Sequence, residues 1–213
     1  MDFVTAVKNG EIDSVRRMLC KEPELAKSEQ GGVSAVLWAM YTGRRDIADL
    51  ITDTSIPLNI YEAAATGHHE RVAELLEENP RAIDSFSSDG FHSLGLACAF
   101  GNETVVKLLV DKCADTTLFT NNPNVRVAPI HSAAFGRNAD AVRHLLEAGA
   151  DPNLLAEGFT ALHTAASNGD SEIVRLLLAK GADTSPKAPD GQTAYDLAMA
   201  AGHEETARII AGK

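Results

Sequence analysis

The chain has 213 residues and a formal net charge of −11, with 45% hydrophobic and 23% charged residues. This composition is typical of a folded globular protein with one core and excludes a disordered chain or a membrane bundle. Acidic chains repel phosphate backbones and no 18 apolar residues run together, so we expect neither nucleic acid nor membrane among the partners.

Segments of small residues that end in glycine recur along the whole chain. The glycines are Gly10, Gly43, Gly67, Gly101, Gly136, Gly169 and Gly202, at successive spacings of 33, 24, 34, 35, 33 and 33 residues. Such a period is typical of solenoids built from one repeated unit. We therefore predict a single all-α solenoid domain over residues 1–213, with about seven units: 1–31, 32–57, 58–89, 90–126, 127–157, 158–190 and 191–213.

The first two units are predicted to recur as the third and fourth. Ala6, Gly10, Val15, Leu19, Pro23 and Ser28 match Ala63, Gly67, Val72, Leu76, Pro80 and Ser85 at a constant offset of 57 residues. Pro23 and Pro80 would each end a second helix before a long finger. The spacing of 24 residues lacks nine relative to 33, so residues 52–58 are predicted to form a tight turn without a hairpin finger.

Between the fourth and fifth units the connection is longer than elsewhere. From Asp115 to Ala128 the chain takes 13 steps, against 10 from Asp183 to Thr193. The sequence therefore predicts an enlarged finger over residues 118–126.

The sixth unit has the clearest pattern. Leu162, Ala165 and Ala166 form one apolar stripe of a first helix, which Gly169 ends. A second helix follows with Leu177 on its apolar face, and Asp190-Gly191 supplies hairpin turn chemistry after it. Each unit is therefore predicted to be helix, turn, helix and β-hairpin finger, stabilised by stacking on its neighbours.

Two motifs resemble those of the ankyrin-repeat family. Residues 128–133 (APIHSA) and 160–165 (TALHTA) match its T-P-L-H-x-A motif, and residues 149–151 and 181–183 match its G-A-D motif. The resemblance covers nearly all of residues 2–211. It implies that His131 and His163 are structural, with rings that bond backbone and hydroxyl groups. Other units have Leu37, Tyr61, Gly95 and Asp196 at this position, so we expect the N-terminal half to lack those hydrogen bonds.

Catalytic, cofactor and metal sites are not expected. Cys20, Cys98 and Cys113 form no CxxC pair, and their odd number favours a reducing, cytoplasmic setting. Residues 68–70 (HHE) are adjacent, so their side chains diverge around a helix and cannot close an HExxH-like metal site. Leu145, Asp151 and Asn153 fit a motif that ankyrin domains offer to an asparaginyl hydroxylase, although the same residues form an ordinary finger turn.

Large apolar side chains mark the predicted binding face. By the resemblance, Tyr41, Phe100 and Phe135 lie on the concave side and outside the core between repeats. Phe119 and Arg126 lie on the enlarged finger. Phe91 is a further candidate, although Phe91 and Phe159 could instead pack against their own fingers. We expect a monomeric, non-catalytic scaffold or adaptor that binds a partner protein through these residues, or alternatively a regulatory or inhibitory subunit of an enzyme.

Overall fold

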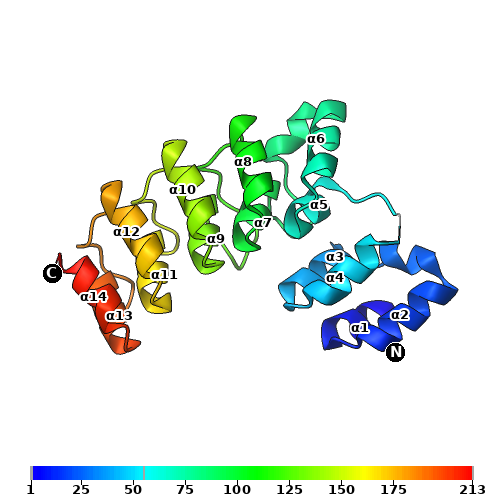
Figure 1. The fold of residues 1–213 in the computed structure, drawn as a ribbon, viewed down its shortest axis with the longest axis horizontal. Coiled ribbons are helices and arrows are strands. Elements are labelled where there is room, and N and C mark those ends of the chain that lie inside the picture. The colour runs from blue at the N-terminus through cyan, green and yellow to red at the C-terminus, as the bar shows by residue number, and fades with distance from the viewer. Residues whose placement is uncertain (1, 55, 213) are drawn as a thin grey trace.

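The structure is a computed structural model that describes residues 2–54 and 56–212. This part of the chain contains fourteen α-helices that follow one another in pairs. The pairs are α1 (Phe3–Asn9) with α2 (Ile12–Lys21), α3 (Ala35–Tyr41) with α4 (Arg45–Thr52), α5 (Ile60–Thr66) with α6 (His69–Glu78), α7 (Ser93–Ala99) with α8 (Glu103–Asp111), α9 (Pro129–Phe135) with α10 (Ala139–Glu147), α11 (Ala161–Asn168) with α12 (Ser171–Ala179), and α13 (Ala194–Ala200) with α14 (Glu204–Ile210). They stack into an arch with the two termini at opposite ends (Figure 1). The predicted all-α solenoid is confirmed.

The first helix of most pairs begins at a side-chain cap. In α1, α5 and α11, the side chains of Asp2, Asn59 and Thr160 accept hydrogen bonds from backbone N–H groups of the first turn. These bonds satisfy donors that a helix start leaves open. Cys113 follows α8 at the position where other units have glycine, and it adopts φ 63°. A non-glycine residue there is uncommon and strained.

The core is built from alanines on the first helices and branched aliphatic residues on the second. Ala97, Ala133 and Ala165 have no exposed surface, and neither have Leu145 and Leu177. Small side chains let neighbouring pairs approach closely, while the larger ones fill the layer between them. The predicted burial of Leu177 is confirmed.

The predicted duplication of the first two units is confirmed by the helix bounds. The helices α1 and α2 begin and end 57 residues before α5 and α6. The short 3-10 helices η1 (Pro23–Lys27) and η2 (Pro80–Asp84) keep the same offset. Both prolines stand at the start of these 3-10 helices, directly after the second helix has ended, as the missing N–H of proline requires.

The fingers contain less β-structure than the predicted hairpins. Within residues 2–54 and 56–212, paired strands occur only in the first finger, where β1 (Glu29–Gln30) pairs antiparallel with β2 (Val33–Ser34). Later fingers close through single bridges, Phe86 with His92, Ala156 with Phe159 and Lys187 with Thr193. The described residues between α4 and α5 contain no strand or bridge, which agrees with the predicted missing finger.

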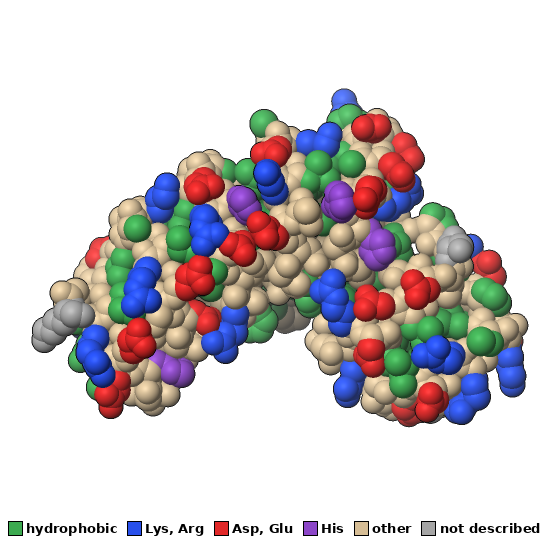
Figure 2. Space-filling view, viewed as in Figure 1, with side chains coloured by type: hydrophobic (Ala, Val, Ile, Leu, Met, Phe, Trp, Pro, Cys, Tyr) green, Lys and Arg blue, Asp and Glu red, His purple; other side chains and the backbone are tan. Residues whose placement is uncertain are grey.

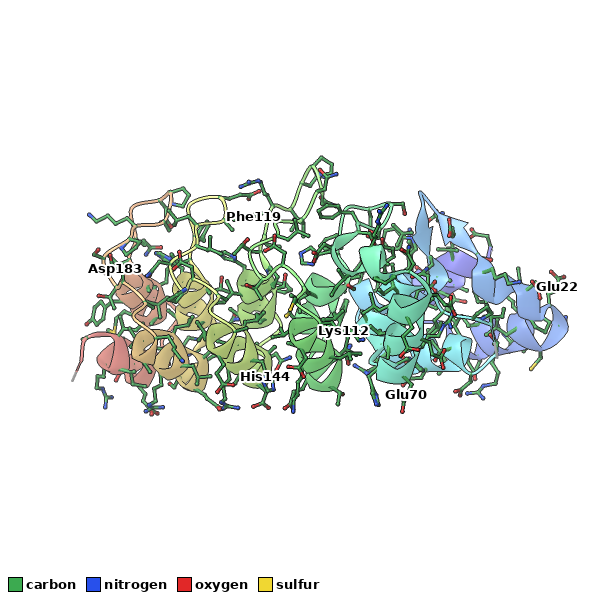
Figure 3. All side chains as sticks on the ribbon, turned by 90° about the horizontal axis from the view of Figure 1, so that it is seen from above. Glu22, Glu70, Lys112, Phe119, His144 and Asp183 are labelled. Atoms are coloured by element: carbon green, nitrogen blue, oxygen red, sulfur yellow. The ribbon has the colours of Figure 1, made fainter. Side chains whose placement is uncertain are left out.

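The predicted enlarged finger over residues 118–126 is a closed loop. The backbone N–H of Thr120 donates to the Val127 carbonyl at 2.9 Å. At its start, the N–H of Asn121 donates to the carbonyl of Gly90 in the preceding finger at 2.8 Å. Figure 3 shows Phe119 on the same edge of the solenoid as Asp183, with His144 toward the opposite edge. The fingers therefore form one edge of the molecule.

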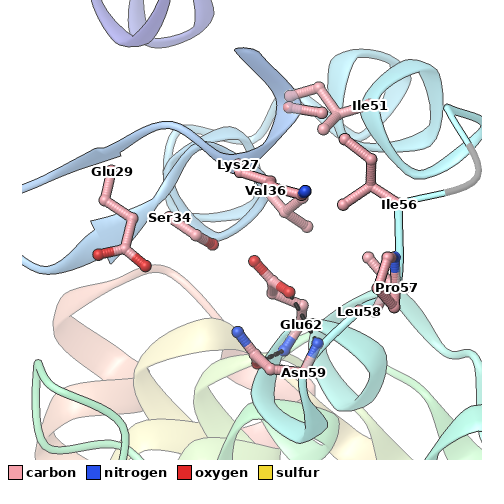
Figure 4. Close-up of a pocket in the computed structure, with 11 residues that line it drawn as sticks. Lys27, Glu29, Ser34, Val36, Ile51, Ile56, Pro57, Leu58, Asn59 and Glu62 are labelled. Atoms are coloured by element: carbon pink, nitrogen blue, oxygen red, sulfur yellow. Dashed lines mark hydrogen bonds between the residues drawn. The ribbon is translucent and has the colours of Figure 1, made fainter. Parts of the chain in front are cut away.

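The missing finger divides the hydrophobic core. One buried cluster spans α1 to α4 with two residues from α5 and α7, and the other spans α5 to α14. Between them lies a cavity of about 190 Å³ lined by Ile51, Ile56 and Glu62, among others (Figure 4). Arg45 crosses the junction and donates to the Thr66 carbonyl at 3.0 Å.

Candidate protein-binding groove

An apolar groove of about 510 Å³ lies along the first helices and fingers of the central units. Its walls come from α3, α7, α9 and α11, and from the fingers that precede the last three of these helices. The largest side chains that line it are Tyr41, Phe91, Phe100, Val125, Phe135 and Phe159. The groove therefore spans several units on both sides of the missing finger.

Its N-terminal wall is a packed aromatic cluster formed by Tyr41, Phe91 and Phe100. The ring centroid of Tyr41 lies 5.8 Å from that of Phe91 and 6.1 Å from that of Phe100. The Tyr41 hydroxyl donates to Asp89 Oδ2 at 2.8 Å. Burial, followed by the nearby Asp89 carboxylate, raises the pKa of Tyr41, so the phenol stays protonated and donates. These residues join the second unit directly to the fourth.

The opposite wall is open to solvent. Phe135 is 76% exposed at the end of α9, which is the highest value among the exposed large hydrophobic residues of the described ranges. Val125 is 40% and Phe159 is 38% exposed. Exposed rings grouped on one concave surface mark an interaction site more often than scattered single residues do.

Arg126 supplies the cation of the groove. Its guanidinium carbon lies 4.2 Å from the ring centroid of Phe119. Phe119 in turn lies beside His131, with 6.4 Å between the ring centroids. Stacking on an aromatic ring holds the guanidinium plane without using its N–H donors.

Structural histidines hold the fingers that carry these residues. His163 Nδ1 accepts from the Thr160 N–H at 3.1 Å, and its Nε2 lies 3.0–3.1 Å class distance from a finger carbonyl, 3.1 Å to Pro186 O. His131 makes the equivalent contact with the Leu154 carbonyl at 3.0 Å. Burial lowers the pKa of both rings, so they act as neutral hydrogen-bonding groups.

In the fourth unit, His92 takes over the place of the missing histidine. A Cβ on Gly95 would lie 3.1 Å from Cε1 of His92, so the His92 ring fills the space above this glycine. Its Nδ1 accepts from the Gly95 N–H at 3.1 Å. The Leu118 carbonyl counteracts the lowering of the pKa of His92 by burial, although Nε2 closes no hydrogen bond within the described residues. The expected loss of the histidine contacts is thus partly compensated here.

In the third unit the position belongs to Glu62 and not to Tyr61. The helix α5 begins at Ile60 after the cap Asn59, and Glu62 Oε2 accepts from the Asn59 N–H at 2.9 Å. The sequence prediction was wrong by one residue, because the helix start could not be fixed without its cap geometry. Tyr61 instead contacts Ser85 through its hydroxyl at 2.8 Å.

Five of the six predicted binding residues line the groove: Tyr41, Phe91, Phe100, Phe135 and Arg126. Phe119 lies beneath Arg126 and supports it. The expectation that Phe100 lies outside the core between repeats is wrong, because its ring packs with Tyr41 and Phe91 against the N-terminal cluster. Sequence reasoning did not single out Val125 or Glu157; the non-glycine residue of positive φ at Glu157 shows no signal in sequence.

Other chemistry was searched over residues 2–54 and 56–212. They contain no group of three or more His, Cys, Asp and Glu side chains that could hold a metal ion. Cys98 is fully buried, and burial raises the pKa of its thiol, which disfavours the reactive thiolate. None of the helices in these ranges is long and apolar enough to cross a membrane.

Stacked helix pairs with fingers along one edge and a groove beside them define a repeat solenoid of the helix-turn-helix class. Residues 130–213 match the family model for ankyrin repeats (3 copies). The chain belongs to the ankyrin-repeat family. Ankyrin repeats generally mediate protein–protein interactions.

Two curated proteins resemble half of the chain. Both are called ankyrin repeat and SAM domain-containing protein 6, one from Rattus norvegicus and one from Mus musculus. Each is 32% identical over 105 residues, which is 48% of this chain. The matched part spans only 12% of the length of these relatives.

Proposed function

We propose that the protein is a non-catalytic scaffold or adaptor that binds a partner protein through the groove and its flanking fingers. The observation that carries this proposal is the groove itself, where Phe135 is 76% exposed beside further aromatic side chains. Burying such rings contributes more to affinity than pairing rim charges does.

The rest of the surface has a different character. Acidic and basic side chains are interspersed over the face shown in Figure 2. With a net charge of −11, we propose a protein partner and no nucleic acid. The free cysteines Cys20, Cys98 and Cys113 support a reducing, cytoplasmic setting. We further propose that the chain acts as a monomer, which light scattering after size exclusion would check.

Affinity purification from the native source with Phe135→Ser tests the proposal. Phe135 is the variant of choice because its ring is exposed, whereas Phe100→Ser would also disturb the core. We expect the wild-type chain to capture a defined partner that Phe135→Ser loses, with the thermal midpoint nearly unchanged. Charge reversal of Glu74 and Glu77 on α6 should leave capture intact. Equal capture by Phe135→Ser would place the binding face elsewhere, and an enzyme as the captured partner would indicate a regulatory subunit.

A further inference from the structure

Arg126 differs from the other groove residues because it offers unused hydrogen-bond donors. The side chain is exposed, and within the described ranges it makes no ion pair or hydrogen bond. Its contact with Phe119 at 4.2 Å uses the face of the guanidinium. The N–H groups at the edge of the guanidinium therefore remain available to a ligand.

The neighbouring arginines show what this chain usually does with a guanidinium. Arg137 lies 2.7 Å from Asp170 Oδ1, and Arg143 lies 3.0 Å from Glu172 Oε1. The chain has 30 acidic residues against 19 Lys and Arg, so carboxylate partners are abundant. An arginine stacked at an apolar groove without such a partner is therefore an unfilled site for an external carboxylate.

The groove also limits where that carboxylate can lie. Glu157 lines the same groove on the side of α11 and repels a second negative charge at that end. Between these two charged residues the lining is largely aromatic and aliphatic, with Phe100 and Phe135 among it. The groove is thus complementary to one large apolar side chain and to one carboxylate at the Arg126 end.

We propose that the groove binds an extended segment of a partner protein that places a large apolar side chain near Phe135 and an Asp or Glu side chain on Arg126. This inference rests on the proposed function and adds the chemistry of the partner. The planar guanidinium, held by Phe119, matches the two oxygens of a carboxylate in a bidentate pair.

A displayed library of random linear peptides, selected on the wild-type chain, tests the inference. We expect the selected peptides to share a large apolar residue and, at a fixed distance from it, Asp or Glu. Arg126→Glu should weaken the best acidic peptide by about tenfold or more. A selection repeated on Arg126→Glu should replace the acidic residue with Lys or Arg. Arg126→Lys should recover only part of the affinity, because it keeps the charge and loses the fork.

Arg81→Glu is the matched control. Arg81 is exposed on η2, outside the groove, and this reversal changes the net charge by the same amount. It should leave peptide affinity unchanged. Peptides that need Phe135 but show no acidic residue, or that bind Arg126→Glu as well as wild type, would overturn this inference and leave the proposed function standing. Failure to enrich any peptide over Phe135→Ser would overturn both.

Discussion

At the scale of single residues, the exchange between positions 92 and 95 is the clearest local device. In the sixth unit, Thr160 caps the helix and His163 reaches the next finger. In the fourth unit, His92 caps the helix and Gly95 leaves room for its ring. The same space is filled by an imidazole from a different position, so the two residues should behave as a coupled pair.

Exchange of the two residues tests this coupling. Gly95→His alone should destabilise the fold, because two imidazoles then compete for one space, and His92→Thr alone leaves that space empty. We expect each single change to lower the free energy of unfolding by about 1–3 kcal/mol. The double variant His92→Thr/Gly95→His should lose less than the sum, since it rebuilds the arrangement of Thr160 and His163. Additive losses in urea titrations would refute the coupling.

The buried histidines also predict a pH dependence. Burial lowers the pKa of His92, His131 and His163 in the folded state. Below the ordinary histidine pKa of about 6.5, the unfolded chain takes up protons that the folded chain does not. The free energy of unfolding should therefore fall as the pH drops from about 7.5 to about 5.5.

Urea titrations across this range measure the effect. His163→Gln should lower stability overall but reduce its dependence on pH, because one proton-binding difference is removed. His69→Gln, at an exposed ring on α6, should keep the wild-type pH dependence. An unchanged slope in His163→Gln would show that this ring is not the source.

At the scale of elements, the absence of one finger explains both the aromatic wall and the main error of the sequence analysis. Without a finger between α4 and α5, the helix α3 contacts the finger that precedes α7, through Tyr41 with Asp89 and Phe91. The missing residues could be counted from glycine spacing. Their consequence for Phe100 could not, because it depends on which distant segments close the gap.

The bond between Tyr41 and Asp89 should stabilise this contact. Tyr41→Phe keeps the ring stacking and removes a hydrogen bond to a partly buried carboxylate, so we expect a loss of about 1–2 kcal/mol in the free energy of unfolding. Tyr195→Phe is the control, because Tyr195 is 40% exposed and its hydroxyl has no hydrogen-bond partner in the described part of the chain. Equal stability of the two variants would mean that the bond contributes nothing.

Packing between second helices gives a further prediction. Leu177 on α12 has no exposed surface, so Leu177→Ala should cost about 2–5 kcal/mol through lost transfer energy and a residual cavity. Glu172→Ala removes an exposed side chain paired with Arg143 at 3.0 Å, which is worth about 1 kcal/mol or less. Chemical denaturation should rank the two in that order, and the reverse order would contradict the packing described for α12.

The match between sequence and structure follows the range of the interactions involved. Caps, glycine ends and the prolines Pro23 and Pro80 act locally, so the helices and the 57-residue offset were predictable. The start of α5 was misplaced because Asn59 and Glu62 cap it reciprocally. The groove brings Tyr41 together with Phe135 and Phe159, and this depends on how successive units stack.

At the scale of the whole molecule, the groove spans the division between the two hydrophobic clusters. Tyr41 and Phe100 pack on the N-terminal cluster, while Phe135 and Phe159 belong to units of the C-terminal part. A partner segment in the groove would contact both parts at once. Binding energy should therefore depend on residues far apart in the sequence, with Phe135 near the centre.

The central claim is that this groove, and not the outer helices, contacts the partner. Site-specific photo-crosslinking in the native source tests it most directly, with a photoreactive phenylalanine analogue at position 135 or, as control, at position 77 on α6. We predict that the probe at position 135 crosslinks one defined protein and that the probe at position 77 does not. Crosslinking of the same protein from position 77, with none from position 135, would contradict the account.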